Sequence, residues 1–135
     1  MSIVFASPAL ASALDSVVSG FGSSVNLAFY SNDVTPTASS TSSTFSSIGS
    51  PQTLSASNWA AAATSNGETA KEYNSTVSGA PQGGPGSSVT IYGYYVFGSN
   101  GNLIYAERFD SPRTATSSQP VVITPKLTAE SIPSA

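Results

Sequence analysis

Short stretches of the chain alternate between apolar and polar residues, which is the pattern of β-strands with one buried face. In residues 25–30, Val25, Leu27 and Phe29 fall on one face, and this predicts a half-buried strand. Residues 71–77 alternate more weakly and indicate a further strand.

The strongest alternation lies in the C-terminal third, over residues 89–97. One face would carry Val89, Ile91, Tyr95 and Phe97 with Gly93 among them, and the other Thr90, Tyr92, Tyr94 and Val96. Residues 99–102 (Ser-Asn-Gly-Asn) predict a hairpin turn, after which 103–109 returns as a strand. On the returning strand we expect Leu103, Tyr105 and Phe109 opposite Ile104 and Ala106.

A last strand is predicted at residues 121–124, continuing to Leu127 after Pro125. Because proline has no N–H to donate, this strand should lie at a sheet edge or carry a bulge there. The small polar residues from Thr128 onward predict a loose tail.

Helical spacing occurs near the start, where apolar side chains recur at the intervals of one helix face: Leu10, Leu14, Val17 and Val18. Ser7 suits an N-cap, Pro8 suits the first helical position, and Gly20 and Gly22 would end the helix.

Polar stretches separate these elements. Residues 37–50 are mostly Ser and Thr and predict a long loop, pinned by Phe45. The Gly- and Pro-rich stretch 78–88 predicts a flexible connection. Asn66-Gly67 is a tight-turn signal. Residues 60–63, all alanine, fit either a helical turn or a strand edge.

These elements predict a mainly β chain: an antiparallel β-sandwich with one short N-terminal helix and long polar loops. We expect an N-terminal arm and helix over residues 1–24, the sandwich over 25–128 and a loose tail over 129–135.

The composition of the chain excludes several classes of function. Only 8% of the 135 residues are charged, 41 are Ser or Thr, and the chain has no His and no Cys. This excludes His-dependent catalytic triads and the usual zinc ligands, so we expect no metal and no cofactor. With four basic residues and a net charge of −3, the chain lacks the clustered positive charge that nucleic-acid binding needs. Neither a membrane span nor a signal peptide is predicted.

The charged residues with the most ordered surroundings are Glu107, Arg108, Asp110 and Arg113. A glycosidase would need two carboxylates across a cleft. Here two arginines stand beside Glu107 and Asp110, so we expect surface or interface salt bridges and no catalysis. Glu68 and Glu72 are interpreted as residues of a solvated loop.

Aromatic side chains gather in the C-terminal third at Tyr92, Tyr94, Tyr95 and Tyr105, with Trp59 as a further candidate. Such a group can form a protein interface or stack on a sugar. Alternation alone leaves open whether the Tyr92/Tyr94 face is covered by the chain's own second layer or by a partner.

Three motifs in order resemble a widespread group of small structural proteins of tailed bacteriophages. They are a "YGYxV" strand at 92–96, a "LLxAERF" strand at 103–109 and a closing "VTPxL" strand at 123–127. The upstream half is similar too, with a "LxLxFYxNDxTP" segment and a "LsaxxW" segment. The matching residues there are Leu27, Phe29, Tyr30, Asn32, Asp33, Thr35 and Pro36, then Leu54 and Trp59.

The resemblance implies a β-sandwich protein of the virion, located on the capsid surface as a cement (decoration) protein. Its partner would be the major capsid protein, bound across subunit junctions. The chain itself would form a homo-oligomer, with a trimer favoured. We expect the contacts at an N-terminal arm with Ile3, Val4 and Phe5, at Tyr92 and Tyr94, and at Glu107, Arg108 and Arg113.

Three alternatives stay open: a phage tail or neck component, a carbohydrate-binding β-sandwich module built on Trp59 and the tyrosines, and, with least support, an enzyme.

Overall fold

Strands dominate the computed structural model, which describes residues 7–19, 24–65, 68–81, 83 and 86–130. The α-helix and strands in chain order are α1 (Ser7–Ser19), β1 (Ser24–Tyr30), β2 (Ser47–Ser55), β3 (Ala63–Ser65), β4 (Glu68–Glu72), β5 (Val77–Gly79), β6 (Ser88–Gly98), β7 (Leu103–Thr116), β8 (Val121–Ile123) and β9 (Lys126–Glu130). Short 3₁₀ turns occur at Ser42–Thr44 and Ala56–Asn58.

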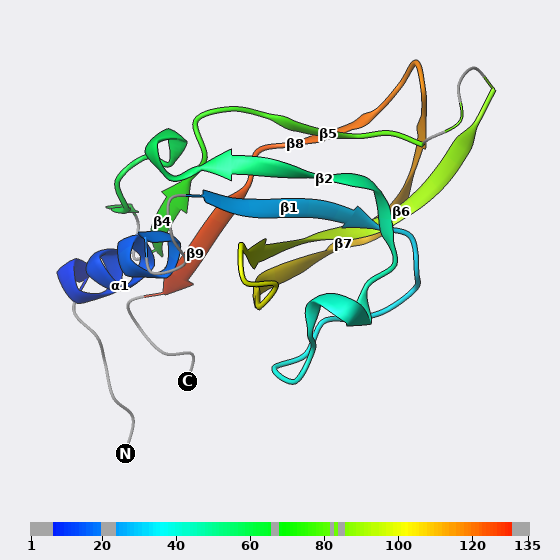
Figure 1. Cartoon of the computed structure of the whole chain (residues 1–135). Helices are drawn as coiled ribbons and strands as arrows, with labels where there is room; N and C mark the ends of the chain where they lie inside the picture. Colours follow the sequence, from blue (N-terminus) through cyan, green and yellow to red (C-terminus); the bar gives the residue numbers. More distant parts are fainter. Residues whose placement is uncertain (1–6, 20–23, 66–67, 82, 84–85, 131–135) are drawn as a thin grey trace.

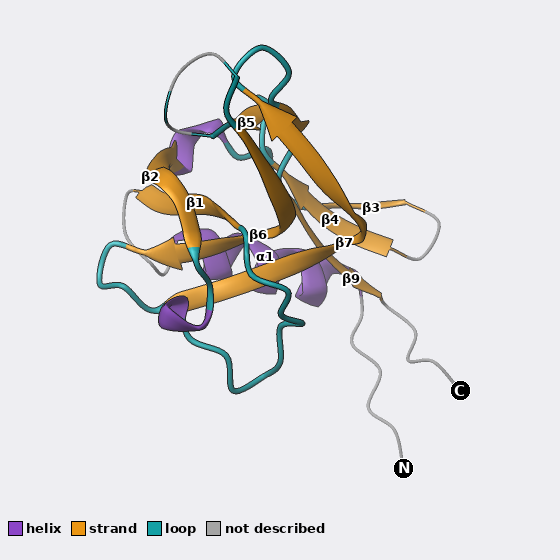
Figure 2. Cartoon of the chain, turned by 90° about the vertical axis from the view of Figure 1, so that its right-hand side faces the viewer, coloured by secondary structure: helices purple, strands orange, loops and turns teal. Residues whose placement is uncertain are grey.

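The largest sheet has four antiparallel strands in the order β2-β1-β6-β7 (Figure 1). Two smaller antiparallel sheets, β3-β4-β9 and β5-β8, lie beside it. Apolar side chains of the large sheet pack with those of the smaller sheets in one core, which includes Leu27, Val96, Tyr73 and Val121. The helix α1 lies against β4, β3 and β9 (Figure 2). The predicted antiparallel sandwich-like fold with a short N-terminal helix is confirmed.

The first strand, β1, is buried on both faces, so the prediction of a half-buried first strand is wrong. On the second face, Ala28 and Tyr30 of β1 pack with Tyr95 of β6 under Phe45. The Phe45 ring stacks on Tyr95 with centroids 4.8 Å apart. The polar loop after β1 thus covers this face through one aromatic side chain, as the predicted role of Phe45 requires.

The predicted faces of β6 are wrong because the strand register shifts between Ile91 and Gly93. Beyond this irregularity Tyr94 and Val96 join Ile91 in the main core, whereas Tyr92, Tyr95 and Phe97 face the other way. At Gly93 a Cβ atom would collide with the carbonyl oxygen of Glu107 and lie 2.7 Å from the Tyr30 hydroxyl. Only glycine lets the two strands approach here.

A second register shift, between Val96 and Phe97, displaces the faces of β7. Tyr105, Phe109 and Ile104 pack on the main core, and Leu103 and Ala106 on the second face. The predicted opposition of Leu103, Tyr105 and Phe109 to Ile104 and Ala106 is therefore wrong.

Several predicted boundaries also change. β2 begins at Ser47, inside the predicted 37–50 loop, because an edge strand exposed on one side needs little apolar patterning. β7 runs seven residues past the predicted end, to Thr116. The 71–77 strand is instead split into β4 and β5, and residues 63–65 form the short β3.

Two further predictions fail in the smaller sheets. Glu68 and Glu72 are exposed at the two ends of β4 and do not belong to a loop. Ala129 and Glu130, predicted in the loose tail, belong to β9. Their pairing with β4 orders them, and their small and polar composition did not indicate this pairing. The predicted turn at 66–67 lies outside the described residues, and Ser65 and Glu68 on its two sides are paired.

Candidate functional site

The outer edge of β7 is the best candidate for an interaction site. β7 is the last strand of the large sheet, and β9 is the last strand of its own sheet. Between them lies a groove of about 520 Å³, here called the β7 groove and lined by Tyr105, Ala106, Glu107, Thr124, Lys126, Leu127 and Thr128. A second hollow of about 370 Å³ shares Tyr105 and Ala106 and extends along β7 to the loop at Pro36 and Thr37.

The β7 wall of the groove is built on a pair of buried phenols. The Tyr94 hydroxyl donates a hydrogen bond of 2.8 Å to Oε2 of Glu107, and the Tyr94 and Tyr105 rings meet edge-on with centroids 6.0 Å apart. Burial raises the pKa of Tyr94 and of Tyr105, so both phenols stay protonated at neutral pH. The exposed Glu107 carboxylate is thereby held in place at the rim.

The β9 wall carries the opposite charge. Lys126 is exposed and its Nζ lies 3.4 Å from the Glu68 carboxylate. The groove therefore has an acidic residue on one wall and a basic one on the other, where Thr124 and Thr128 also line it. Such a rim suits a polar or mixed-charge partner segment.

The structure separates the residues that the sequence had placed on one contact face. Tyr94 is 2% exposed and belongs to the main core, so the predicted Tyr92/Tyr94 face is wrong. Tyr92 is half-buried on the opposite side, with the Arg108 guanidinium 5.5 Å from its ring centroid. Arg108 also pairs with Asp33 at 2.5 Å.

Of the four charged residues at 107–113, for which surface or interface salt bridges were predicted, Arg108 forms a surface ion pair, but with a residue outside this group. Arg108 pairs with Asp33 from the loop after β1, Glu107 accepts from Tyr94, and Arg113 lies 4.2 Å above the Phe109 ring. In a strand, neighbouring residues point to opposite faces, and this separates Glu107 from Arg108. The predicted arm residues Ile3, Val4 and Phe5 lie outside the described residues.

Trp59 is not part of an exposed aromatic platform. Its side chain is 6% exposed and packs edge-on against Tyr73, with ring centroids 5.3 Å apart. A sugar-binding platform needs an accessible ring face, so Trp59 cannot supply one in this conformation.

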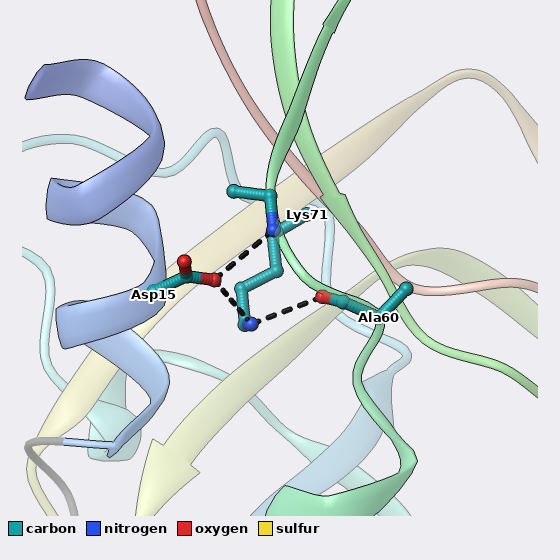
Figure 3. Close-up of polar contacts among 4 residues, drawn as sticks. Asp15, Ala60 and Lys71 are labelled. Carbon is teal, nitrogen blue, oxygen red and sulfur yellow. Dashed lines mark hydrogen bonds and ion pairs between the residues drawn. The ribbon is translucent and has the colours of Figure 1, made fainter. Parts of the chain in front are cut away.

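Sequence reasoning missed a polar cluster that joins α1 to the small sheet (Figure 3). Lys71 of β4 is only 7% exposed, and its Nζ donates to Oδ1 of Asp15 at 2.6 Å and to the Ala60 carbonyl at 3.0 Å. The same Asp15 oxygen accepts from the Ala62 N–H at 3.1 Å. These hydrogen bonds hold the pKa of the Asp15 carboxyl below its ordinary value, and the bond from Lys71 has the largest effect. Nothing in the spacing of residues 15 and 71 indicates this contact.

Among the described residues, no group of three or more His, Cys, Asp or Glu side chains is placed to hold a metal ion. No described helix is long and apolar enough to cross a membrane. Comparison with protein-family models and with curated proteins finds no match to this sequence.

Proposed function

We propose that the chain is a capsid decoration protein of a tailed bacteriophage, and that it binds the major capsid protein through the β7 groove. The observation that carries the proposal is the pair of sheet edges that meet at this groove. A sheet edge offers a row of backbone donors and acceptors, and natural proteins cover or use such edges. The resemblance to phage structural proteins supplies the identity of the partner.

The remaining chemistry of the chain supports a binding role. The surface is poor in charge, so contact with a shell would depend on apolar burial and neutral hydrogen bonds more than on ion pairs. Each copy needs only a modest interface, because a shell repeats the contact many times and multiplies its effect. The homo-oligomer implied by the resemblance, with a trimer favoured, stays a prediction.

Of the alternative functions, a tail or neck component uses the same surface and differs only in location. A carbohydrate-binding module loses Trp59 as its platform because that side chain is buried. The decoration function therefore keeps the most support.

The test is co-sedimentation of the purified chain with shells of the major capsid protein that lack it. We expect Thr128→Arg to weaken binding by roughly tenfold or more, because a bulky side chain fills the groove. Thr114→Arg is the matched control, since it adds the same side chain at an exposed position near the far end of β7. Circular dichroism would verify that both variants fold.

If the unaltered chain does not sediment with the shells, the decoration function is wrong. If Thr128→Arg binds as well as the control, the groove is not the contact. Deletion of residues 2–6 in the same assay tests the predicted arm at Ile3, Val4 and Phe5.

A further inference from the structure

We propose that α1 is a detachable helix, latched to the sandwich by the Asp15–Lys71 ion pair, and that loss of this charge pair releases it while the sandwich stays folded. The latch is the cluster of Asp15, Lys71 and the backbone of Ala60 and Ala62 (Figure 3). The inference is independent of which partner the sandwich binds.

Neither of the two apolar clusters of the sandwich includes an α1 residue among the residues described. Within the part of α1 whose side chains are described, Leu14 is buried and Ala11 and Val17 are partly buried, whereas Ser12, Ala13 and Ser16 are exposed. Release of the helix would therefore expose Leu14 but would remove no described member of either cluster.

The latch joins an almost fully buried lysine to an aspartate whose side chain is 46% exposed. Lys71 is 7% exposed, and without the Asp15 carboxylate its ammonium would keep the hydrogen bond to the Ala60 carbonyl but would have no counter-charge among its described hydrogen-bond and ion-pair partners. Removing the partner of a buried charge is destabilising, because it leaves an uncompensated charge in the interior. The ammonium regains water if α1 moves away.

The other nearby charged side chains that are described face away from the latch. Asp15 is the one charged residue of α1, and β3 has none. On β4 the buried residues Thr69 and Lys71 alternate with the exposed Glu68 and Glu72, which lie on the other face. On β9, Lys126 stands opposite Glu72 and shares its face, and the Glu130 side chain lies outside the described residues.

Acid should open the latch. Because the pKa of Asp15 is lowered in the folded chain, its contribution to docking is present above the ordinary value of 3.8 and is lost as the pH falls below it. A freed 13-residue helix is only marginally stable in water, so α1 should also lose helical structure on release.

The chain offers a direct readout, because it has one tryptophan and no cysteine. A dye on Ser12→Cys, an exposed α1 position, accepts energy from Trp59, and amide hydrogen exchange in β1 and β6 reports whether the core is intact. At neutral pH, Asp15→Ala should lose most of the energy transfer while β1 and β6 stay protected. Alanine favours helix more than aspartate, so the loss would not reflect a weaker helix.

Two further variants separate charge from packing. Glu72→Ala removes a carboxylate next to Lys71 on the other face of β4 and should leave the transfer unchanged. In the double variant Asp15→Ala/Lys71→Met, the transfer should return, because no charge is stranded. The proposal is wrong if Asp15→Ala transfers energy like the unaltered chain, if β1 and β6 lose protection together with α1, or if the double variant does not recover.

Discussion

At the scale of single residues, burial fixes the state of the tyrosines. Tyr94 and Tyr105 lie between the main core and the β7 groove, and Tyr30 and Tyr95 lie under Phe45 on the second face. Burial raises the pKa of all four phenols. The folded chain therefore holds these protons at a pH where unfolded tyrosines release them.

Alkaline pH should destabilise the fold for this reason. Stability is full below the unfolded pKa of about 10 and should fall by roughly 1.4 kcal/mol per pH unit above it for each tyrosine held protonated. Denaturant unfolding at a series of alkaline pH values measures the slope, and absorbance of tyrosinate follows the ionisation. A free energy of unfolding that stays level to pH about 11 would contradict the burial of these phenols.

At the scale of elements, the loop after β1 acts as the second layer over one face of the large sheet. Phe45 is 6% exposed and contacts Tyr30 and Tyr95 with ring centroids 4.8 Å away in each case. Asn32 ties the same loop down, because its amide donates to the Thr44 carbonyl and its Oδ1 accepts from the Ser46 N–H. One apolar anchor and one amide thus order a mostly Ser/Thr segment.

Phe45→Ala should therefore cost about 3–5 kcal/mol in the free energy of unfolding, the usual loss for truncating a buried phenylalanine. Ser39→Ala, an exposed position in the same loop, should change it by no more than about 0.5 kcal/mol. Chemical denaturation of both variants measures the difference. Equal stability of the two would mean that the loop does not cover the sheet.

Periodicity predicted the elements with strong alternation and missed those held mainly by neighbours. The helix, β1 and the β6–β7 hairpin follow from local pattern. The single strand predicted across Pro125 is wrong, because β8 and β9 on its two sides belong to different sheets. β2 and the second half of β7 do not, because edge strands with exposed faces are ordered by backbone pairing. The register shift near Gly93 changed the faces of β6, and for this reason Tyr92 and Tyr94 do not share the predicted face.

The functional surface was predicted only in part. Glu107 was a candidate and lines the β7 groove, but Lys126 and Thr128 on the other wall were assigned to a strand end and a loose tail. The groove exists because β7 and β9, edge strands of two separate sheets, both contribute residues to its lining. No local pattern carries that information.

At the scale of the whole molecule, the motifs on which the proposed phage resemblance rests contribute residues to the core. Tyr94, Val96, Phe109 and Pro125, which belong to the three C-terminal motifs, are all buried. The resemblance therefore describes how the chain folds, whereas the decoration function depends on the exposed β7 groove. That function has to be tested on the particle itself.

The most direct test of the proposed decoration function is quantitative mass spectrometry of purified phage particles, with copies of the chain counted relative to the major capsid protein. A decoration protein predicts a ratio near one, or a simple fraction set by the shell symmetry. A handful of copies per particle would place the chain in the neck or tail, and its absence from the particle would contradict a virion function altogether.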